Sequence, residues 1–329
     1  MNQLPKIGIA GTGSYVPERV FTNHDFKGIE TSDEWIRERT GIRERRYARA
    51  DEASSHMAVE AAKRAMESAG VAPEEIDLIV VGTVTPDNAF PSTACHLQHA
   101  LGCARAAAFD VSAACTGFIY SLSVGWSMAR AMGYRNVLVV GVEKLSSIIN
   151  MEDRTSCILF GDGAGAAVLR PMPEGPSEIL FSSLHSMGGH EDVMSLPAGG
   201  TRMLPTHETI DQKKHFIHIK GREVFKFAVT KMVEMVELAA AKVGVPVSKI
   251  STIIPHQVNL RIIEYAAEKL NYPLERMMIN IERYGNTSAA SVPIALDEAV
   301  KSGRVKRGDL VVMVAFGAGL TWGGIALKY

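Results

Sequence analysis

Residues 70–81, GVAPEEIDLIVV, return in altered form as residues 244–255, GVPVSKISTIIP, and this repeat decides the fold. Each copy starts with a glycine that ends a predicted helix, and then passes through a polar turn into an apolar strand. The two glycines lie 174 residues apart (244 − 70). Two related helix–turn–strand segments at this distance indicate a duplicated unit.

The repeat extends to both sides of these segments. Helices are predicted over residues 55–69 and 227–243, and the strands that follow open at Ile76 and Ile250. Further corresponding pairs are the predicted strands 107–111 (AAFDV) and 277–281 (MMINI), the helices that end at Gly133 and Gly303, the apolar strands from Val137 and Val311, and the glycine-rich hairpins GDGAGAAVL and GAGLTWGGIAL. Strands that alternate with helices are typical of parallel sheets. We therefore predict two α/β halves, residues 1–172 and 173–329, with 171–222 as a linker and surface loop region near a pocket.

The composition describes an ordinary globular protein. The chain has 329 residues, of which 47% are hydrophobic, and this composition excludes a disordered chain. Its formal net charge of −1 disfavours a general nucleic-acid binder. The uncharged run 310–327 contains four glycines, so we interpret it as two buried strands and a turn rather than a membrane span. No signal peptide is expected at the N-terminus. The cysteines show no metal-type spacing and favour a reduced, cytosolic compartment; they are Cys95, Cys103, Cys115 and Cys157.

Cys115 is the strongest candidate for a reactive group. It lies where a predicted strand meets a predicted helix, among the small residues Ala113, Ala114, Thr116 and Gly117. Small neighbours permit a sharp turn and close approach of a substrate, and a helix N-terminus lowers the pKa of a thiol and favours the thiolate. A small buried hydrophobe is the usual role of a free cysteine and is the alternative interpretation.

Two further candidates follow strands of the second half. His256 comes directly after a strand and could exchange a proton in a cleft, although a lone histidine is more often structural. Asn286 could cap the next helix, or its amide could stabilise an oxyanion together with a backbone N–H from AFGAG at 315–319. Basic clusters at 37–49 and 213–226 are either solvated faces or sites for an anionic partner.

Seven segments together resemble the β-ketoacyl-acyl-carrier-protein synthase III family, which has the thiolase fold. They are TSDEWIRERTGIRER (31–45), AFPSTAC (89–95), DVSAACTGF (110–118), FGDGAGAAVL (160–169), PHQVNLRI (255–262), YGNTSAASVP (284–293) and AFGAGLTWG (315–323). The resemblance spans nearly the whole chain. It implies an α/β, thiolase-like fold, in which duplicated βαβαβαββ halves form a layered α/β/α/β/α core.

The resemblance also implies an activity. An acyl-CoA primer and malonyl-acyl-carrier protein would undergo decarboxylative Claisen condensation to 3-oxoacyl-acyl-carrier protein, initiating fatty acid synthesis through an acyl-cysteine thioester. Cys115 would carry the acyl group, and His256 and Asn286 would stabilise the enolate that forms on decarboxylation. The N–H groups of Cys115 and Ala318 would form the oxyanion hole, although the family usually has glycine where this chain has Ala318. No cofactor or metal is implied, since CoA and phosphopantetheine thioesters are substrates.

The same resemblance implies binding residues and partners. Trp35 and Arg154 would sandwich the CoA adenine, Arg39 would contact a phosphate, and Gly221 and Asn259 would contact pantetheine. Carrier-protein docking would involve Lys226, Gln257 and Arg261, and Phe90 would cross a dimer interface to bound the acyl pocket. The family implies a cytoplasmic homodimer with neither a nucleic-acid nor a membrane partner.

Other proteins with related residues fit less well. Thiolases need a second reactive cysteine, and none follows Cys157; elongating synthases have histidine where this chain has Asn286. Chalcone-type synthases are longer and lack the basic docking run. A papain-like protease shares the Cys-His-Asn order but not the duplicated α/β pattern, and an inactive scaffold has no need of all three residues. The preferred primer and a dedicated secondary-metabolite role stay open.

Overall fold

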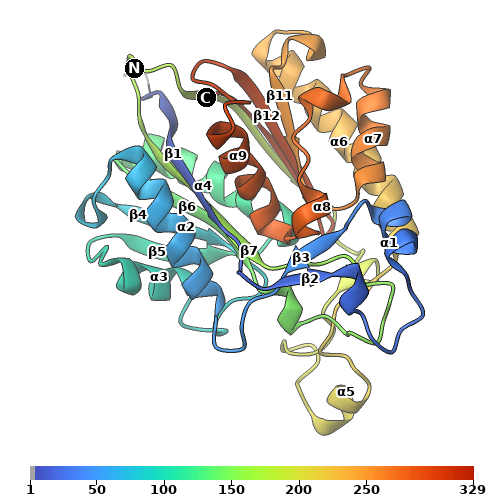
Figure 1. Ribbon diagram of the computed structural model, residues 1–329. Coiled ribbons are helices and arrows are strands. Elements are labelled where there is room, and N and C mark those ends of the chain that lie inside the picture. Colours follow the sequence, from blue (N-terminus) through green and yellow to red (C-terminus); the bar gives the residue numbers. More distant parts are fainter. Residues whose placement is uncertain (1–3) are drawn as a thin grey trace.

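Two mixed β-sheets form the framework of the computed structural model, which describes residues 4–329. The first sheet has the order β1 (Ile7–Tyr15), β7 (Gly163–Pro171), β6 (Val137–Glu143), β4 (Leu78–Gly82) and β5 (Ala107–Val111). The second has the order β11 (Thr252–Pro255), β12 (Leu310–Gly317), β13 (Thr321–Lys328) and β8 (Glu178–Ser186). Both sheets are buried between helices, which explains their nearly continuous apolar strands (Figure 1).

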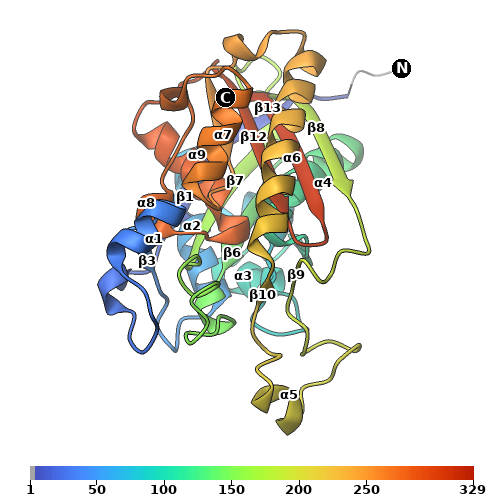
Figure 2. The same ribbon diagram turned by 90° about the vertical axis from the view of Figure 1, so that its right-hand side faces the viewer.

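The helices complete five layers. α2 (Ser54–Ala69) and α3 (Thr93–Leu101) cover the outer face of the first sheet, and α6 (Gly221–Val243) and α7 (Leu260–Lys269) cover that of the second. Between the sheets lie α4 (Gly117–Met132) and α9 (Ser291–Lys301), each in contact with both. The layered α/β/α/β/α core of the sequence analysis is therefore confirmed (Figures 1 and 2).

Shorter elements lie around this core. They are α1 (Asp33–Thr40), β2 (Val20–Thr22), β3 (Glu44–Arg46), β9 (Met194–Ser195), α5 (His207–Asp211), β10 (His218–Ile219) and α8 (Ile281–Tyr284). The segment that carries α5 projects away from the layers (Figure 2). Within residues 4–329, no helix is both long enough and apolar enough to cross a membrane.

The strand orders show the duplication directly. From one edge, β1-β7-β6-β4 of the first sheet corresponds to β8-β13-β12-β11 of the second, with the same parallel and antiparallel pairings. Gly70 and Gly244 both end their helices in the left-handed conformation, at φ values of 61° and 79°. The repeat detected in the sequence is thus a repeat in three dimensions.

One predicted strand is wrong. Residues 277–281 form no strand, and only a single parallel bridge joins Met277 to Ile253 at the place that β5 occupies in the first sheet. The side chain of Gln257 takes the hydrogen bonds that a ladder would need, since its Nε2 donates to the Met278 carbonyl and its Oε1 accepts from the Asn280 N–H. The backbone therefore leaves the sheet after one residue.

Smaller differences have local causes. The strands after Gly70 and Gly244 begin at Leu78 and Thr252 rather than at the isoleucines, because 3-10 turns occupy Pro73–Glu75 and Val247–Lys249. The sheets are mixed rather than parallel, and residues 171–222 contribute the edge strand β8 as well as loops. β12 and β13 form the expected hairpin, but β6 and β7 are joined by the long segment 144–162.

The two halves touch backbone to backbone at Gly141 of β6. A Cβ atom on Gly141 would overlap the carbonyl oxygen of Ala289, which lies in the 3-10 turn η7 (Ser288–Ala290) of the second half. We predict that Gly141→Ala lowers the free energy of unfolding by about 1–3 kcal/mol, because the backbone of η7 must shift. Urea denaturation measures this loss. Gly188→Ala is the control, since nothing lies within 4 Å of its added Cβ, and an equal loss in both variants would contradict the close-contact argument.

Candidate active site

Cys115, His256 and Asn286 line one narrow pocket of about 30 Å³ between the two halves. Cys115 lies in the 3-10 turn η3 (Ala114–Thr116) after β5, His256 follows β11 directly, and Asn286 follows α8. Cys115 and His256 follow the carboxyl-terminal ends of strands and Asn286 follows the segment that corresponds to β5, so the duplicated fold brings the three together as the sequence predicts.

The ionisation state of Cys115 differs from the sequence expectation. Burial raises the pKa of the Cys115 thiol to about 12, and the charge of Glu143 also raises it, whereas hydrogen bonds from Ser288 and from the cysteine's own N–H lower it. Cys115 is only 4% exposed, and α4 begins two residues after it, at Gly117. The expected thiolate is therefore wrong for the free protein, because desolvation of the charged form outweighs the helix terminus.

His256 is neutral and has one ring nitrogen free. Burial lowers the pKa of His256 to about 3, so the imidazole carries no charge near neutral pH. Its Nδ1 lies 2.6 Å from the Ser291 hydroxyl at the start of α9, and its ring packs edge-on against Phe316. Its Nε2 is buried without a hydrogen-bond partner in the described chain. That nitrogen is available to a substrate in the pocket.

Asn286 is held by its backbone and by one side of its amide. Its N–H donates to the Leu159 carbonyl, and its own carbonyl accepts from the Gly161 N–H, which fastens it to the first half. Its Oδ1 accepts from the Ser288 N–H at 2.8 Å. The Nδ2 group has no partner among the residues described, so the amide presents donors to the pocket.

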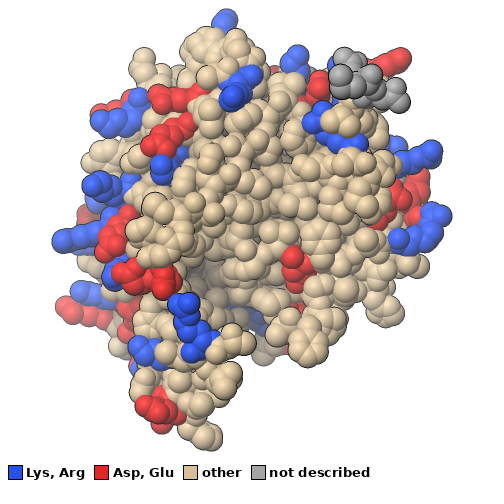
Figure 3. All heavy atoms as spheres, turned by 180° about the vertical axis from the view of Figure 1, so that it is seen from behind, with Lys and Arg blue, Asp and Glu red and all other residues tan. Residues whose placement is uncertain are grey.

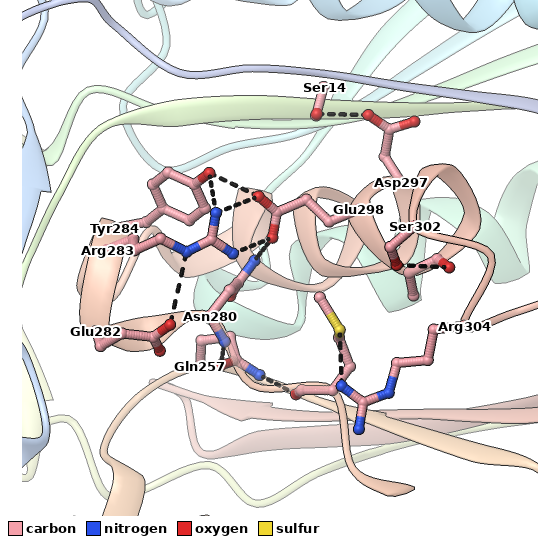
Figure 4. Close-up of polar contacts among 12 residues, drawn as sticks. Ser14, Gln257, Asn280, Glu282, Arg283, Tyr284, Asp297, Glu298, Ser302 and Arg304 are labelled. Atoms are coloured by element: carbon pink, nitrogen blue, oxygen red, sulfur yellow. Dashed lines mark hydrogen bonds and ion pairs between the residues drawn. The ribbon is translucent and has the colours of Figure 1, made fainter. Parts of the chain in front are cut away.

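A polar network on the second half supports this arrangement (Figure 4). Glu298 of α9 accepts hydrogen bonds from Asn280, Arg283 and Tyr284, which lie on the segment that leads into Asn286. Gln257 connects Asn280 to the segment that carries His256. The network thus couples the positions of the histidine and the asparagine.

Gln257 is a correction to the sequence analysis. The expected docking role is wrong, because Gln257 is 1% exposed and its amide bonds internally to Pro255, Met278 and Asn280. The docking role was assigned from the resemblance of the run QVNLR at 257–261, which does not show that its first residue is buried. Ser291, which contacts His256, was missed, although it lies within the segment YGNTSAASVP at 284–293.

The turn between β12 and β13 adds backbone donors. Gly317 approaches the Cys115 backbone so closely that a Cβ on it would lie 2.8 Å from the Cys115 nitrogen. Ala318 follows in the turn and lines the pocket beside Cys115. Neither the N–H of Cys115 nor that of Ala318 donates to another residue within 4–329. Two such N–H groups, one on Cys115 itself and one on a residue that lines the same pocket, are suited to a developing oxyanion.

A second, apolar cavity of about 150 Å³ lies beside this pocket. It is lined by Ala114, which precedes Cys115 in the chain, and by Ser288 and Ala318. Its remaining walls include Val84, Leu145, Ile148, Phe160, Met194, Leu196 and Ile217. Met194 and Ala318 belong to both pockets, so an apolar group attached to Cys115 can extend into this space.

The candidate nucleotide residues gather on the surface. The guanidinium carbons of Arg39 and Arg154 lie 4.3 Å and 5.2 Å from the centre of the Trp35 ring. Arg154 also donates to the Glu30 carbonyl. The Asn259 amide donates to the Arg39 carbonyl at 3.0 Å and so links this cluster to the start of α7.

The other candidates are exposed. Gly221 is the first residue of α6, Lys226 follows within that helix, and Arg261 lines a shallow groove between α6 and α7. Phe90 is 87% exposed and lines neither pocket of this chain. No cluster of histidine, cysteine or carboxylate side chains able to hold a metal occurs among residues 4–329.

Comparisons with known proteins agree on one family. Two family models match, the C-terminal model of 3-oxoacyl-[acyl-carrier-protein] synthase III over residues 240–329 and the companion model over 109–188. The β-ketoacyl-[acyl-carrier-protein] synthase III of Symbiobacterium thermophilum is 52% identical, covering 99% of both chains.

Solved structures give the same result. The 3-oxoacyl-[acyl-carrier-protein] synthase III of Aquifex aeolicus superimposes with a TM-score of 0.90 at 48% identity, covering 98% of this chain and 100% of that one. A priming β-ketosynthase from the R1128 polyketide biosynthetic pathway also has a TM-score of 0.90, at 37% identity, with 99% and 97% coverage.

The neutral thiol can be tested without a substrate. We predict that iodoacetamide at pH 7.5 labels the exposed Cys95 well before Cys115, because a pKa of about 12 leaves a thiolate fraction about a thousandfold below that of an ordinary thiol. Peptide mass spectrometry over time measures both sites. Labelling of Cys115 as fast as Cys95 would contradict the burial argument and restore the thiolate expected from the sequence.

Proposed function

The chain belongs to the 3-oxoacyl-[acyl-carrier-protein] synthase III family and is a condensing acyltransferase, and we propose how its pocket performs the reaction. An acyl-CoA primer acylates Cys115, and malonyl-acyl-carrier protein then loses CO₂ and attacks the acyl group. The product is 3-oxoacyl-acyl-carrier protein, which initiates fatty acid synthesis.

Acylation uses the sulfur and the backbone donors. The Cys115 sulfur attacks the thioester carbonyl, and the N–H groups of Cys115 and Ala318 stabilise the resulting oxyanion. The methyl group of Ala318 leaves its N–H intact. The primer chain occupies the apolar cavity beside Ser288, whose walls of leucine, isoleucine and phenylalanine favour an uncharged acyl group.

The observation that carries the proposal is the pair of neutral donors opposite Cys115. Loss of CO₂ from a malonyl thioester leaves an enolate, and its oxygen needs hydrogen-bond donors that do not protonate the carbon. The free Nε2 of neutral His256 and the free Nδ2 of Asn286 meet this need. For Nε2 to carry the proton, the Ser291 hydroxyl must donate to Nδ1, which its 2.6 Å distance allows.

The nucleotide end of the primer is assigned to the Trp35 cluster. An adenine between Trp35 and Arg154 needs about 7 Å, two van der Waals contacts, so the guanidinium at 5.2 Å must swing away when CoA binds. Arg39 contacts a phosphate, and Gly221 and Asn259 line the path of the pantetheine. Lys226 and Arg261 are exposed positive charges on α6 and α7 that can pair with an acidic carrier protein, although Glu264 and Glu268 line the same groove as Arg261.

A second copy of the chain completes the proposed enzyme. β5 is the edge strand of the first sheet and is only half-buried, and Phe90 is almost fully exposed. The side of the molecule opposite α9 carries few charged residues near its centre (Figure 3). We propose a cytoplasmic homodimer in which Phe90 reaches the partner's acyl cavity, with the halves divided as residues 1–172 and 173–329.

The first functional test separates the two half-reactions. A panel of acetyl-, butyryl- and isobutyryl-CoA should add an acyl mass to the Cys115 peptide, and Cys115→Ser should lose it because an alkoxide forms far less readily than a thiolate. His256→Ala and Asn286→Ala should retain labelling and lose malonyl decarboxylation by about 100-fold, as removal of an oxyanion donor does. Loss of labelling with intact decarboxylation would reverse the roles assigned here.

The nucleotide assignment has its own test. Arg154→Ala should raise the KM for acyl-CoA about tenfold with little change in kcat, since one stacking face of the adenine is lost. Arg130→Ala is the matched control, because Arg130 covers Trp126 at 4.8 Å in the same manner on another part of the surface. Equal KM values for the two variants would exclude Trp35 and Arg154 as the adenine site.

A further inference from the structure

Glu143 is a buried carboxyl group that no step of the proposed reaction uses. It is the last residue of β6 and is fully buried. In the loop that follows β4, the hydroxyls of Thr83 and Thr85 and the N–H groups of Val84 and Thr85 all donate to it. These donors belong to the first half and hold the carboxyl group in place. Among residues 4–329, its one remaining donor is the Ser288 hydroxyl of the second half, at 3.1 Å.

Ser288 connects this carboxyl group to the Asn286 amide. The backbone of Ser288 has a φ of 48°, in the left-handed region, which a serine keeps only where the surrounding contacts hold it. The hydrogen bond to Glu143 is such a contact, and the turn brings the Ser288 N–H to 2.8 Å from Oδ1 of Asn286. A backbone N–H can only donate, so it selects the oxygen end of the amide.

The orientation of this amide has a chemical consequence. A carboxamide donates from its nitrogen and accepts at its oxygen, and the two ends have nearly the same shape. With Nδ2 toward the pocket, Asn286 donates a hydrogen bond to the enolate oxygen. With the two ends exchanged, the Asn286 carbonyl oxygen would face an oxygen that carries negative charge. The same side chain would then oppose the decarboxylation that it otherwise stabilises.

We propose that Glu143 and Ser288 are positioning residues that hold Asn286 with its Nδ2 group toward the enolate oxygen. Glu143 fixes the Ser288 hydroxyl, the turn at Ser288 fixes its N–H, and that N–H fixes the amide. Neither positioning residue transfers a proton or contacts the enolate. The inference rests on the proposed function, since it concerns the decarboxylation step, and it deepens that function by naming the groups that orient one of the two donors.

This effect can be separated from the stability of the fold. Without the Ser288 hydroxyl, Glu143 keeps its donors from the loop after β4. The backbone of Asn286 stays bonded to Leu159 and Gly161 in either case. Loss of the Ser288 hydroxyl should therefore free the Asn286 side chain and leave the surrounding segments in place.

The test compares the two half-reactions in Ser288→Ala. Release of labelled CO₂ from malonyl-acyl-carrier protein should slow about tenfold, because an amide that can rotate presents its donor only part of the time. Labelling of Cys115 by acyl-CoA should stay within about threefold of the wild type. Ser14→Ala is the matched control, since the Ser14 hydroxyl also donates across the two halves to a fully buried carboxylate, Asp297 (Figure 4). It should leave both half-reactions within about twofold of the wild type.

Variants of Glu143 separate the contact from its charge. In Glu143→Gln, the N–H groups of Val84 and Thr85 require the amide oxygen, so the amide nitrogen faces Ser288, whose hydroxyl can accept from it. This variant should therefore keep decarboxylation within about threefold of the wild type, whereas Glu143→Ala should lose about tenfold. Equal losses in the two variants would overturn the positioning role. If Glu143→Ala shows no cooperative thermal transition, Ser288→Ala and Glu143→Gln decide the question.

A double variant tests whether the effect passes through Asn286. Ser288→Ala combined with Asn286→Ala should decarboxylate no more slowly than Asn286→Ala alone, because there is then no amide left to orient. Additive losses, or unchanged decarboxylation in Ser288→Ala while Asn286→Ala is slow, would overturn the inference and leave the proposed function standing. Unchanged decarboxylation in Asn286→Ala would instead refute the role of Asn286 in the proposed function, and the inference with it.

Discussion

Desolvation of three polar side chains is the constraint on which the pocket depends. Cys115, His256 and Glu143 are all buried, and within residues 4–329 no partner of opposite charge stabilises the charged form of any of them by an ion pair. Removal from water raises the pKa of the acids and lowers that of the imidazole, so each group is driven toward its neutral form. A neutral imidazole donates a hydrogen bond to an enolate without protonating it, which a water-exposed histidine could not do as reliably near neutral pH. The pocket thus offers a substrate neutral hydrogen-bonding groups at Cys115 and His256 rather than fixed charges.

The duplication could be predicted from the sequence because its signals are local. Glycine caps at Gly70 and Gly244, and apolar strands at a constant offset, depend only on propensity and pattern, and they predicted the two duplicated α/β halves. The same reasoning placed Cys115, His256 and Asn286 in one cleft, since each follows an element at the carboxyl-terminal edge. The predicted strand over 277–281 is wrong because a tertiary contact takes the place of strand pairing: the Gln257 amide forms hydrogen bonds with that backbone from another segment. No periodicity within five residues carries that information.

The prediction that Cys115 is a thiolate failed for a different reason. A cysteine beside a helix start has a lowered pKa only while water or a cation also stabilises the thiolate, and the sequence does not show how deeply the turn is buried. Gly317 closes against the Cys115 backbone from the other half, and Ala318 covers the same side. The contact of the 317–318 turn with Cys115 therefore both supplies an oxyanion donor and excludes water from the sulfur. A site built from two halves gains both effects from a single interface, and neither half predicts them alone.

The six residues from Asn286 to Ser291 show most clearly that the packing of the two halves and the geometry of the site depend on each other. The Asn286 amide faces the pocket, the Ser288 hydroxyl donates to Glu143, and the Ser291 hydroxyl contacts His256. These three contacts require the chain to turn sharply at Ser288, whose φ of 48° costs strain that regular helix would avoid. Gly141 permits the turn, because only a residue without a Cβ lets β6 approach Ala289 so closely. A bulkier residue at that crossing would displace the segment that makes all three polar contacts, so packing between the halves and the polar geometry of the site are one structural requirement.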